Sequence, residues 1–347
     1  MYVGALMLKF SNYQARFFIM NHHSSNIRFI GGAAIKRTTK AAFIMLTAFL
    51  VLPVAISHGK EDRQQLWLIN TRCAPLSGDL QAGQKSIHYW RLSSDCVWQH
   101  ANEESFSTGS DADVSTTILI HGNRHDDDQA IGFAWPIYRR MLKNAQDKPF
   151  RLVIWSWPSE QIGRRTRPDV QLKFRYCDAQ AYYLAAQLER LPEDMPLCLI
   201  GYSMGAKIAA AGLHLLAGGE VACQKLYKEN ASNQSNKHFA SANMLMVSAA
   251  MDDDSLAADG TYSRAISQVD RILVVRNACD RALKWYPRIY GRRGPDALGF
   301  VGPAGCGEYQ NIELLDVSCV VGKAHRWESY LSSCSLLEAI DRYIFKD

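Results

Sequence analysis

The residue best suited to chemistry in this sequence is Ser203, because of the residues around it. An apolar run at 197–200 leads into Gly201-Tyr202-Ser203-Met204-Gly205, and an alanine-rich, helix-forming stretch follows. This pattern predicts a strand, a sharp turn and a helix, with the serine hydroxyl lifted clear of the sheet and both glycines allowing a close backbone approach. A serine held in this way can act as a nucleophile. The alternative is a packing turn in which Ser203 only caps the helix.

Two later residues are placed to assist Ser203. A serine hydroxyl is a weak nucleophile at neutral pH, and it needs a histidine to take its proton and a carboxylate to orient that histidine. His325 follows the last predicted strand, and Asp280 follows the strand before it, which gives the order serine, acid, histidine. We therefore predict Ser203, Asp280 and His325 as the catalytic residues. Asp252, the first of three consecutive aspartates, is the rival acid, and capping of a helix is the alternative role for Asp280.

A negative charge that develops on a substrate oxygen needs two preorganised backbone donors. One expected donor is the amide of Met204, directly after the nucleophile. The other is expected after an earlier strand, where His121-Gly122-Asn123 stands. Because Gly122 lets the backbone turn inwards, we predict the amide of Asn123 as the second donor.

The same loop also has residue types that could bind a metal. His121 and His125 stand close to three aspartates at 126–128. The spacing matches no recognised zinc motif such as His-Glu-x-x-His, so no metal is predicted. The chain also lacks a glycine pattern for binding nucleotides, and no organic cofactor is expected.

The predicted elements bring these residues to one edge of a sheet. Strands alternate with helices, which implies crossover connections and a mostly parallel sheet with helices on both faces. The first two strands suit an antiparallel start. Strands are expected at 66–71, 87–92, 116–120, 152–157, 197–200, 244–248, 272–275 and 312–321, and helices at 129–144, at 178–191 and after Ser203.

Two stretches do not follow this alternation of strands and helices. Residues 220–243 are polar, and residues 291–307 are rich in glycine and proline. Long loops near a catalytic edge often shape a substrate cleft, and an irregular surface loop is the equal alternative. Whether 220–243 forms a lid is left open.

The first 57 residues differ in charge from the rest of the chain. The formal net charge is +5, and residues 1–57 hold six basic and no acidic residues, so residues 58–347 carry −1. A body so close to neutral argues against a nucleic-acid surface. A basic cluster at 36–40 and an apolar run at 41–56 are typical of a signal peptide or a membrane anchor. We therefore expect a leader at 1–57, a start of translation as late as Met20 as an alternative, and an exported domain at 58–347.

Export would place the cysteines in an oxidising compartment. All nine follow the leader, and proximity in sequence makes Cys73 with Cys96 and Cys306 with Cys319 plausible disulfides. An odd number leaves at least one thiol free. Cys198, inside an apolar run, is expected to pack as a small hydrophobic residue.

From about residue 64 to its end, the chain resembles the α/β-hydrolase superfamily. The residues that carry the resemblance are Ile120-His121-Gly122-Asn123, Trp155-Ser156-Trp157-Pro158, Gly201-Tyr202-Ser203-Met204-Gly205, Asp280 and His325. The combination looks like a bacterial branch of the superfamily that is exported and has no assigned substrate. The resemblance implies an α/β-hydrolase fold with a mostly parallel, eight-stranded sheet and acyl transfer through an acyl-enzyme.

The expected function is hydrolysis of a carboxylic ester, with a small-molecule or lipid ester as the partner. Membrane association is expected only through residues 41–57. A peptidase or acyltransferase with the same three residues is one alternative, and release of amines or transfer to an added alcohol would distinguish it. A binding protein that keeps the fold without catalysis is the other.

Overall fold

The computed structural model describes residues 63–108, 114–222, 224–225, 239, 241–289, 291, 294–305 and 310–345. The predicted leader at 1–57, most of the candidate lid at 220–243 and the predicted Cys306–Cys319 pair lie wholly or partly outside these residues. These predictions therefore stay predictions. In the part of the chain that is described, no helix has both the length and the hydropathy needed to cross a bilayer.

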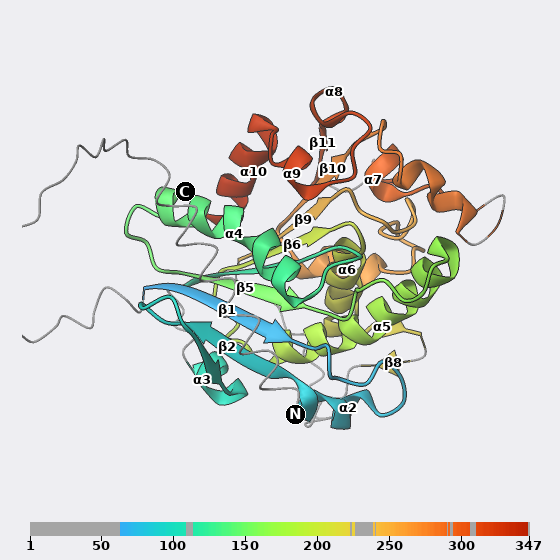
Figure 1. Ribbon diagram of the computed structural model, residues 1–347. Coiled ribbons are helices and arrows are strands. Elements are labelled where there is room, and N and C mark those ends of the chain that lie inside the picture. Colours follow the sequence, from blue (N-terminus) through green and yellow to red (C-terminus); the bar gives the residue numbers. More distant parts are fainter. Residues whose placement is uncertain are drawn as a thin grey trace, which may run out of the picture. The chain divides into compact units, whose positions relative to one another are not determined.

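A single large sheet forms the centre of the domain (Figure 1). Nine strands build it among the described residues. Their order across the sheet is β3 (Trp98–Ala101), β2 (His88–Leu92), β1 (Gln64–Asn70), β5 (Phe150–Ser156), β4 (Ser115–Ile120), β6 (Leu197–Tyr202), β9 (Ala242–Val247), β10 (Arg271–Arg276) and β11 (Ile312–Asp316). All neighbours from β1 to β11 are parallel, whereas β2 is antiparallel to both β1 and β3.

This arrangement confirms the predicted α/β-hydrolase fold with its antiparallel start. The sheet has one strand more than the eight expected. The additional strand is β3 at the edge, where the side chains are exposed or only partly buried. Because no apolar alternation marks such a strand, the sequence pattern did not reveal it.

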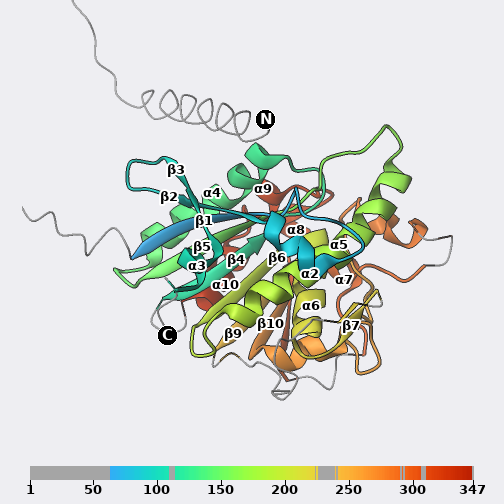
Figure 2. The same cartoon turned by 90° about the horizontal axis from the view of Figure 1, so that it is seen from below.

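Helices cover both faces of the sheet (Figures 1 and 2). α4 (Asp127–Asn144) and α10 (Cys334–Ile344) share one face, where Arg140 of α4 pairs with Asp341 of α10. α5 (Thr166–Arg190) and α6 (Met204–Leu216) pack together on the other face, where Lys207 pairs with Asp178. The shorter elements are α2 (Leu80–Gly83), η1 (Gln84–Ser86), α3 (Glu103–Thr108), η2 (Ser263–Gln268), η3 (Leu283–Arg288), α7 (Leu298–Val301), α8 (Ser318–Val321), α9 (Trp327–Tyr330) and the ribbon of β7 (Glu220–Val221) with β8 (Gln224–Lys225).

The register of the central strands decides where the functional loops meet. Ile120 at the end of β4 lies beside Gly201 of β6, which lies beside Met246 of β9. Val247 at the end of β9 lies beside Val275 of β10. The loops after β4, β6, β9 and β10 therefore emerge together at the carboxyl edge of the sheet.

Two predicted elements have different bounds in the structure. α5 begins at Thr166 rather than near residue 178, because Pro168 stands in its first turn, where a missing N–H costs no helical hydrogen bond. The last strand ends at Asp316 rather than at 321. The carboxylate of Asp316 accepts from the amide of Ser318 at 2.9 Å, and this turn leads into α8.

The predicted disulfide between Cys73 and Cys96 is wrong. Cys73 forms no disulfide, and neither do Cys177, Cys198, Cys279 and Cys334. Cys73 follows the carboxyl end of β1, whereas Cys96 lies in the turn from β2 to β3, at the opposite end of the β1–β2 pair. A seven-residue strand spans about 20 Å, far beyond the reach of a disulfide. Cys198 is buried in β6, as a small core residue should be.

Candidate active site

Ser203 stands in a strained turn between β6 and α6. Its φ of 55° and ψ of −116° lie outside the backbone regions that residues other than glycine readily adopt. A Cβ at Gly201 would meet the backbone of Ala206 at 2.5 Å, and one at Gly205 would meet the carbonyl oxygen of Ile120 at 2.2 Å. Both glycines are therefore required for the close approach of strand and helix. Ser203 occupies the N-cap position of α6, but its side chain makes no capping bond and remains available.

The structure brings the three side chains predicted as catalytic residues into contact. Nε2 of His325 lies 3.0 Å from Oγ of Ser203, and Nδ1 of His325 lies 2.6 Å from Oδ2 of Asp280. A carboxylate cannot donate, so this arrangement assigns the imidazole proton to Nδ1. Nε2 is then free to accept the hydroxyl proton of Ser203, as a general base must.

Asp280 is fully buried, and both of its oxygens have partners. Oδ1 accepts from the amides of Ala282 and Leu283 at 2.9 and 3.1 Å, so the carboxylate also caps the turn that follows. Burial favours the neutral acid, but the bonds from His325 and other donors outweigh it and lower the pKa of Asp280. The rival Asp252 lies elsewhere, where it accepts from the hydroxyl of Tyr286 at 2.7 Å.

Three further side chains hold Asp280 and His325 in position, and the sequence analysis missed them. The hydroxyl of Tyr330 lies 2.8 Å from Oδ2 of Asp280, and Oγ of Ser248 lies 3.1 Å from the same oxygen. On the other side, Tyr202 stacks on the ring of His325 and donates to its carbonyl oxygen at 2.9 Å. Only Ser248 had a usable signal, since it ends the strand predicted at 244–248.

The two predicted oxyanion donors flank Ser203. Met204 is the first residue of α6, where an amide has no acceptor within the helix and the helix dipole favours negative charge. The loop that carries Asn123 lies directly against the nucleophile, because a Cβ at Gly122 would be 3.2 Å from Cβ of Ser203. Asn123 and Met204 both line the cleft that contains Ser203.

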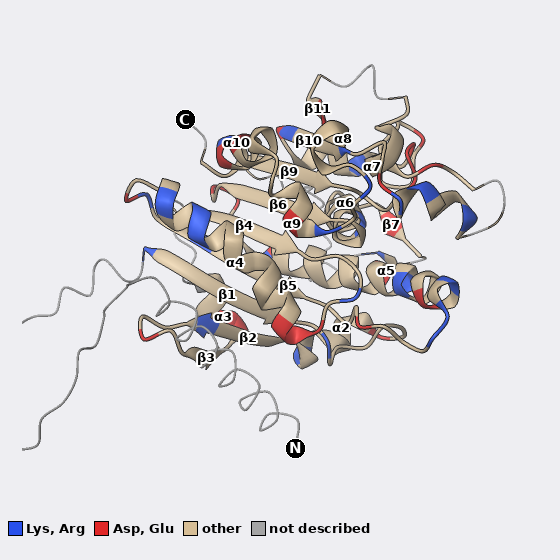
Figure 3. Ribbon diagram, turned by 45° about the horizontal axis from the view of Figure 1, so that its top comes forward, with Lys and Arg blue, Asp and Glu red and all other residues tan. Residues whose placement is uncertain are grey.

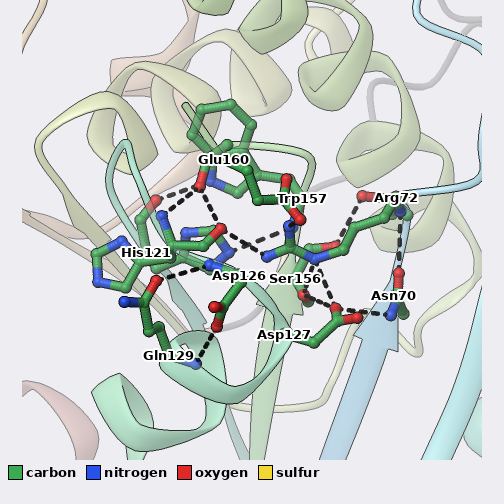
Figure 4. A network of polar contacts seen from close by, with 12 residues as sticks. Asn70, Arg72, His121, Asp126, Asp127, Gln129, Ser156, Trp157 and Glu160 are labelled. Atoms are coloured by element: carbon green, nitrogen blue, oxygen red, sulfur yellow. Dashed lines mark hydrogen bonds and ion pairs between the residues drawn. The ribbon is translucent and has the colours of Figure 1, made fainter. Parts of the chain in front are cut away.

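The histidines and aspartates of the loop after β4 have partners within the protein (Figure 4). His121 is buried beside Trp157, and Nε2 of His121 accepts from the amide of Trp157 at 3.3 Å while the indole N–H donates to the His121 carbonyl at 2.9 Å. Asp126 caps α4 together with Gln129. Within the described residues, no three His, Cys, Asp or Glu side chains form a group suited to a metal ion.

Arg72 joins the loop after β4 to the ends of β1 and β5. Its guanidinium pairs with Asp127 at 2.6 Å, reaches Oγ of Ser156 at 2.8 Å and donates to the carbonyl of His125 at 3.1 Å. The arginine is 9% exposed, so these bonds are shielded from water. Figure 4 shows the network around it, which fixes the loop that bears Asn123. A single arginine between two predicted strands gave no signal in the sequence.

Ser203 opens into a cleft of about 1210 Å³. One wall is apolar and is built from α5, the first residue of α6 and η3. The mouth is basic, and its arginines come from the loop after β4, the first turn of α5, η3 and the residue before α9. The residues that line the cleft include Arg124, Arg167, Val170, Phe174, Met204, Leu283, Trp285, Tyr286, Arg288, Arg326 and Glu328.

No protein-family model and no curated protein matches the chain. Solved structures similar to it include acyl-protein thioesterase 2 from Zea mays, with 17% identity, a TM-score of 0.34, and coverage of 65% of this chain and 94% of that one. Esterase B from Lactobacillus rhamnosis has 12% identity, a TM-score of 0.35, and coverage of 81% and 87%. A lipase-esterase related protein from Clostridium acetobutylicum ATCC 824 has 14% identity, a TM-score of 0.33, and coverage of 68% and 97%. At these values the likeness is distant, and the chemistry of the site is judged from this chain's own geometry.

Proposed function

We propose that this protein is a serine hydrolase that cleaves a carboxylic ester through an acyl-enzyme on Ser203. The observation that carries the proposal is the unbroken chain of contacts from Oγ of Ser203 through His325 to the buried carboxylate of Asp280. The strained turn supports it as well, because such strain is kept where it serves a function. A helix cap would need neither the strain nor the histidine.

The chemistry follows from these positions. His325 takes the hydroxyl proton as Oγ of Ser203 attacks the ester carbonyl, and the amides of Met204 and Asn123 stabilise the oxyanion. The tetrahedral intermediate collapses, His325 gives its proton to the departing alcohol, and an acyl group stays on Ser203. Water, deprotonated by His325, then attacks the acyl-enzyme and releases the acid. Asp280 stays ionised and orients His325 throughout.

A fluorophosphonate probe tests the proposal, since it reacts with an activated serine and with few others. We expect rapid labelling of the wild-type protein and none of Ser203→Ala. Ser267→Ala serves as the control, because the side chain of this exposed serine bonds only to a nearby carbonyl. The Ser267→Ala protein should hydrolyse p-nitrophenyl butyrate, whereas the Ser203→Ala protein should not. A wild-type protein that resists the probe, or Ser203→Ala protein that labels equally, would refute the proposal.

Two related activities are separated by the products. Release of an amine from a matched amide would identify a peptidase, and transfer of the acyl group to an added alcohol would identify an acyltransferase. We propose an ester because its alcohol leaves the tetrahedral intermediate more readily than the amine of an amide does. Ser203, His325 and Asp280 are therefore sufficient for cleavage of an ester bond.

We further propose that residues 1–57 direct export and that the domain acts outside the cytoplasm or at a membrane. The basic cluster at 36–40 and the apolar run at 41–56 support this proposal. The intact mass of the protein from fractionated cells tests it. A full-length chain in the soluble cytoplasm would contradict both cleavage and anchoring.

A further inference from the structure

The mouth of the cleft gathers four arginines. Arg124, Arg167, Arg288 and Arg326 all line it, and they come from four different segments of the chain. Among the described residues that line the cleft, the only acidic one is Glu328. Figure 3 shows Lys and Arg on the N-terminal part of α5 and on the neighbouring segment that contains η3. The local balance is therefore strongly positive.

None of these four arginines forms an ion pair with a described residue. Five other arginines of the described chain do pair with aspartate or glutamate, namely Arg72, Arg140, Arg190, Arg271 and Arg276. The cleft therefore carries uncompensated positive charge, although residues 58–347 as a whole carry only −1.

Contacts that leave most of their donors free hold three of the four guanidinium groups in place. Arg167 donates through Nε to the carbonyl of Ile289 at 3.0 Å, and Arg124 reaches the hydroxyl of Thr166 at 3.4 Å. Arg288 stacks on Trp285 with its guanidinium carbon 4.2 Å from the ring centroid. A guanidinium has five N–H donors, so each group can still bind an anion while it keeps its present contact.

The inner wall of the cleft has the opposite character. Phe174, Met204, Leu283 and Tyr286 are buried apolar or aromatic side chains, and Val170 is partly buried beside them. Ser203 lines the same cleft as this wall and the four arginines. A ligand that spans both would combine a hydrocarbon portion with a negative charge.

We propose that the cleft selects esters that carry an anionic group, with hydrocarbon against the inner wall and the anion among the four arginines. This inference rests on the proposed hydrolase function and names its substrate class. Carboxylate and phosphate both fit, because guanidinium groups bind either through paired N–H donors. The charge can belong to the acyl half or to the alcohol half of the ester, and the test distinguishes the two.

The test compares matched esters on the wild-type protein. The p-nitrophenyl monoester of adipate carries a carboxylate on the acyl half, and its methyl ester is neutral with the same leaving group. For the alcohol half, the butyryl ester of m-hydroxybenzoate is compared with that of methyl m-hydroxybenzoate. We expect kcat/KM to favour the anionic member of at least one pair by about fivefold to tenfold at low salt. The preference should shrink in about 0.5 M KCl, where exposed charges are screened.

Variants assign the preference to the arginines. Arg167→Gln and Arg288→Gln should each lower the ratio of kcat/KM for the anionic over the neutral ester about threefold, while Arg288→Lys, which keeps the charge, should retain most of that ratio. Arg175→Gln is the matched control, because Arg175 is exposed on α5 but does not line the cleft. It should leave the preference unchanged.

The outcomes separate this inference from the proposed function. Equal rates on both members of both pairs, with activity that depends on Ser203, would overturn the inference and leave the hydrolase standing. A preference that survives in both glutamine variants would overturn it too. Binding to Ser203→Ala protein of the anilide analogues of the adipate pair, which resist cleavage, supplies a readout without turnover. If the Ser203→Ala protein binds the anionic analogue selectively but the wild-type protein hydrolyses none of the four esters, the anion site is supported and the proposed hydrolase function is contradicted.

Discussion

Tyr330 shows how much of the site depends on single residues that never meet a substrate. Its hydroxyl donates to the same oxygen of Asp280 that faces His325, yet Tyr330 does not line the cleft. Burial, and then the charge of Asp280, raise the pKa of Tyr330, so it remains a donor at every pH of interest. It is a positioning residue for the carboxylate.

We expect Tyr330→Phe to lower kcat about tenfold, the effect of about 1.4 kcal/mol, with KM nearly unchanged. The acidic limb of the rate profile should also move to higher pH, because Asp280 loses a bond that favours its ionised form. Steady-state kinetics across pH measure both effects. Tyr183→Phe is the control, since its hydroxyl donates to the carbonyl of Pro75 at 2.6 Å, away from the site. Equal losses in the two variants would contradict a positioning role.

Among the individual residues of the site, the catalytic ones could be predicted from the sequence, whereas most of those that position them could not. The order of Ser203, Asp280 and His325 along the chain could be anticipated, because each follows an apolar strand and parallel strands end at one edge. Tyr330 acts through Asp280, whereas Ser248 contacts both Asp280 and His325. The place of Ser248 at the end of a predicted strand was its only signal, and nothing in a single sequence marks a tyrosine that bonds to a side chain far along the chain.

The loop between β4 and α4 is the element on which the oxyanion site depends, and Arg72 fixes it from outside. The guanidinium ties Asp127 at the start of α4 to Ser156 at the end of β5. Removal of a buried partner from such a network leaves a charge unpaired, which costs more than the loss of an exposed ion pair.

Arg72→Met should therefore lower the free energy of unfolding by about 3 kcal/mol and also reduce kcat, because the loop that bears Asn123 loses its tether. Arg190→Met is the matched control. Arg190 pairs with Glu103 at 2.9 Å, but the two side chains are 39% and 42% exposed, so less than about 1 kcal/mol is expected. Urea unfolding with parallel activity assays measures both. Similar losses in the two variants would show that the network does not stabilise the loop.

Prediction of the elements succeeded where burial on both faces left an apolar run, as in β4, β6 and β10. It failed at β3, because a strand at the edge of the sheet needs no apolar run. It also failed at the start of α5, because Pro168 indicated a loop although a proline is tolerated in the first turn of a helix. The Cys73–Cys96 pair failed for a related reason: proximity along the chain says little about which end of a strand a residue reaches.

Across the whole molecule, buried histidines link stability to pH. Burial, with nearby positive charge, holds the pKa of His121 well below its usual range, and a proton on Nε2 would face the N–H of Trp157. The folded state therefore keeps His121 neutral, while the unfolded chain takes up a proton below about pH 6.5. The unfolded state binds more protons there, so stability falls as pH falls.

We expect the free energy of unfolding to decline below about pH 6.5, with His121 contributing up to about 1.4 kcal/mol per pH unit. His121→Gln should reduce this slope, whatever it does to stability at neutral pH. His88→Gln, at an exposed position on β2, should leave the slope as it is. Chemical denaturation at several pH values provides the comparison. An unchanged slope in His121→Gln would remove His121 as the source.

The basic mouth of the cleft has an implication for turnover. Hydrolysis adds a carboxylate, so the two products together carry one negative charge more than the ester that entered. We expect the guanidinium groups that draw the ester in to slow the departure of an anionic product at low ionic strength. Added salt should therefore lower the rate constant for association of the substrate and raise the rate constant for dissociation of the product.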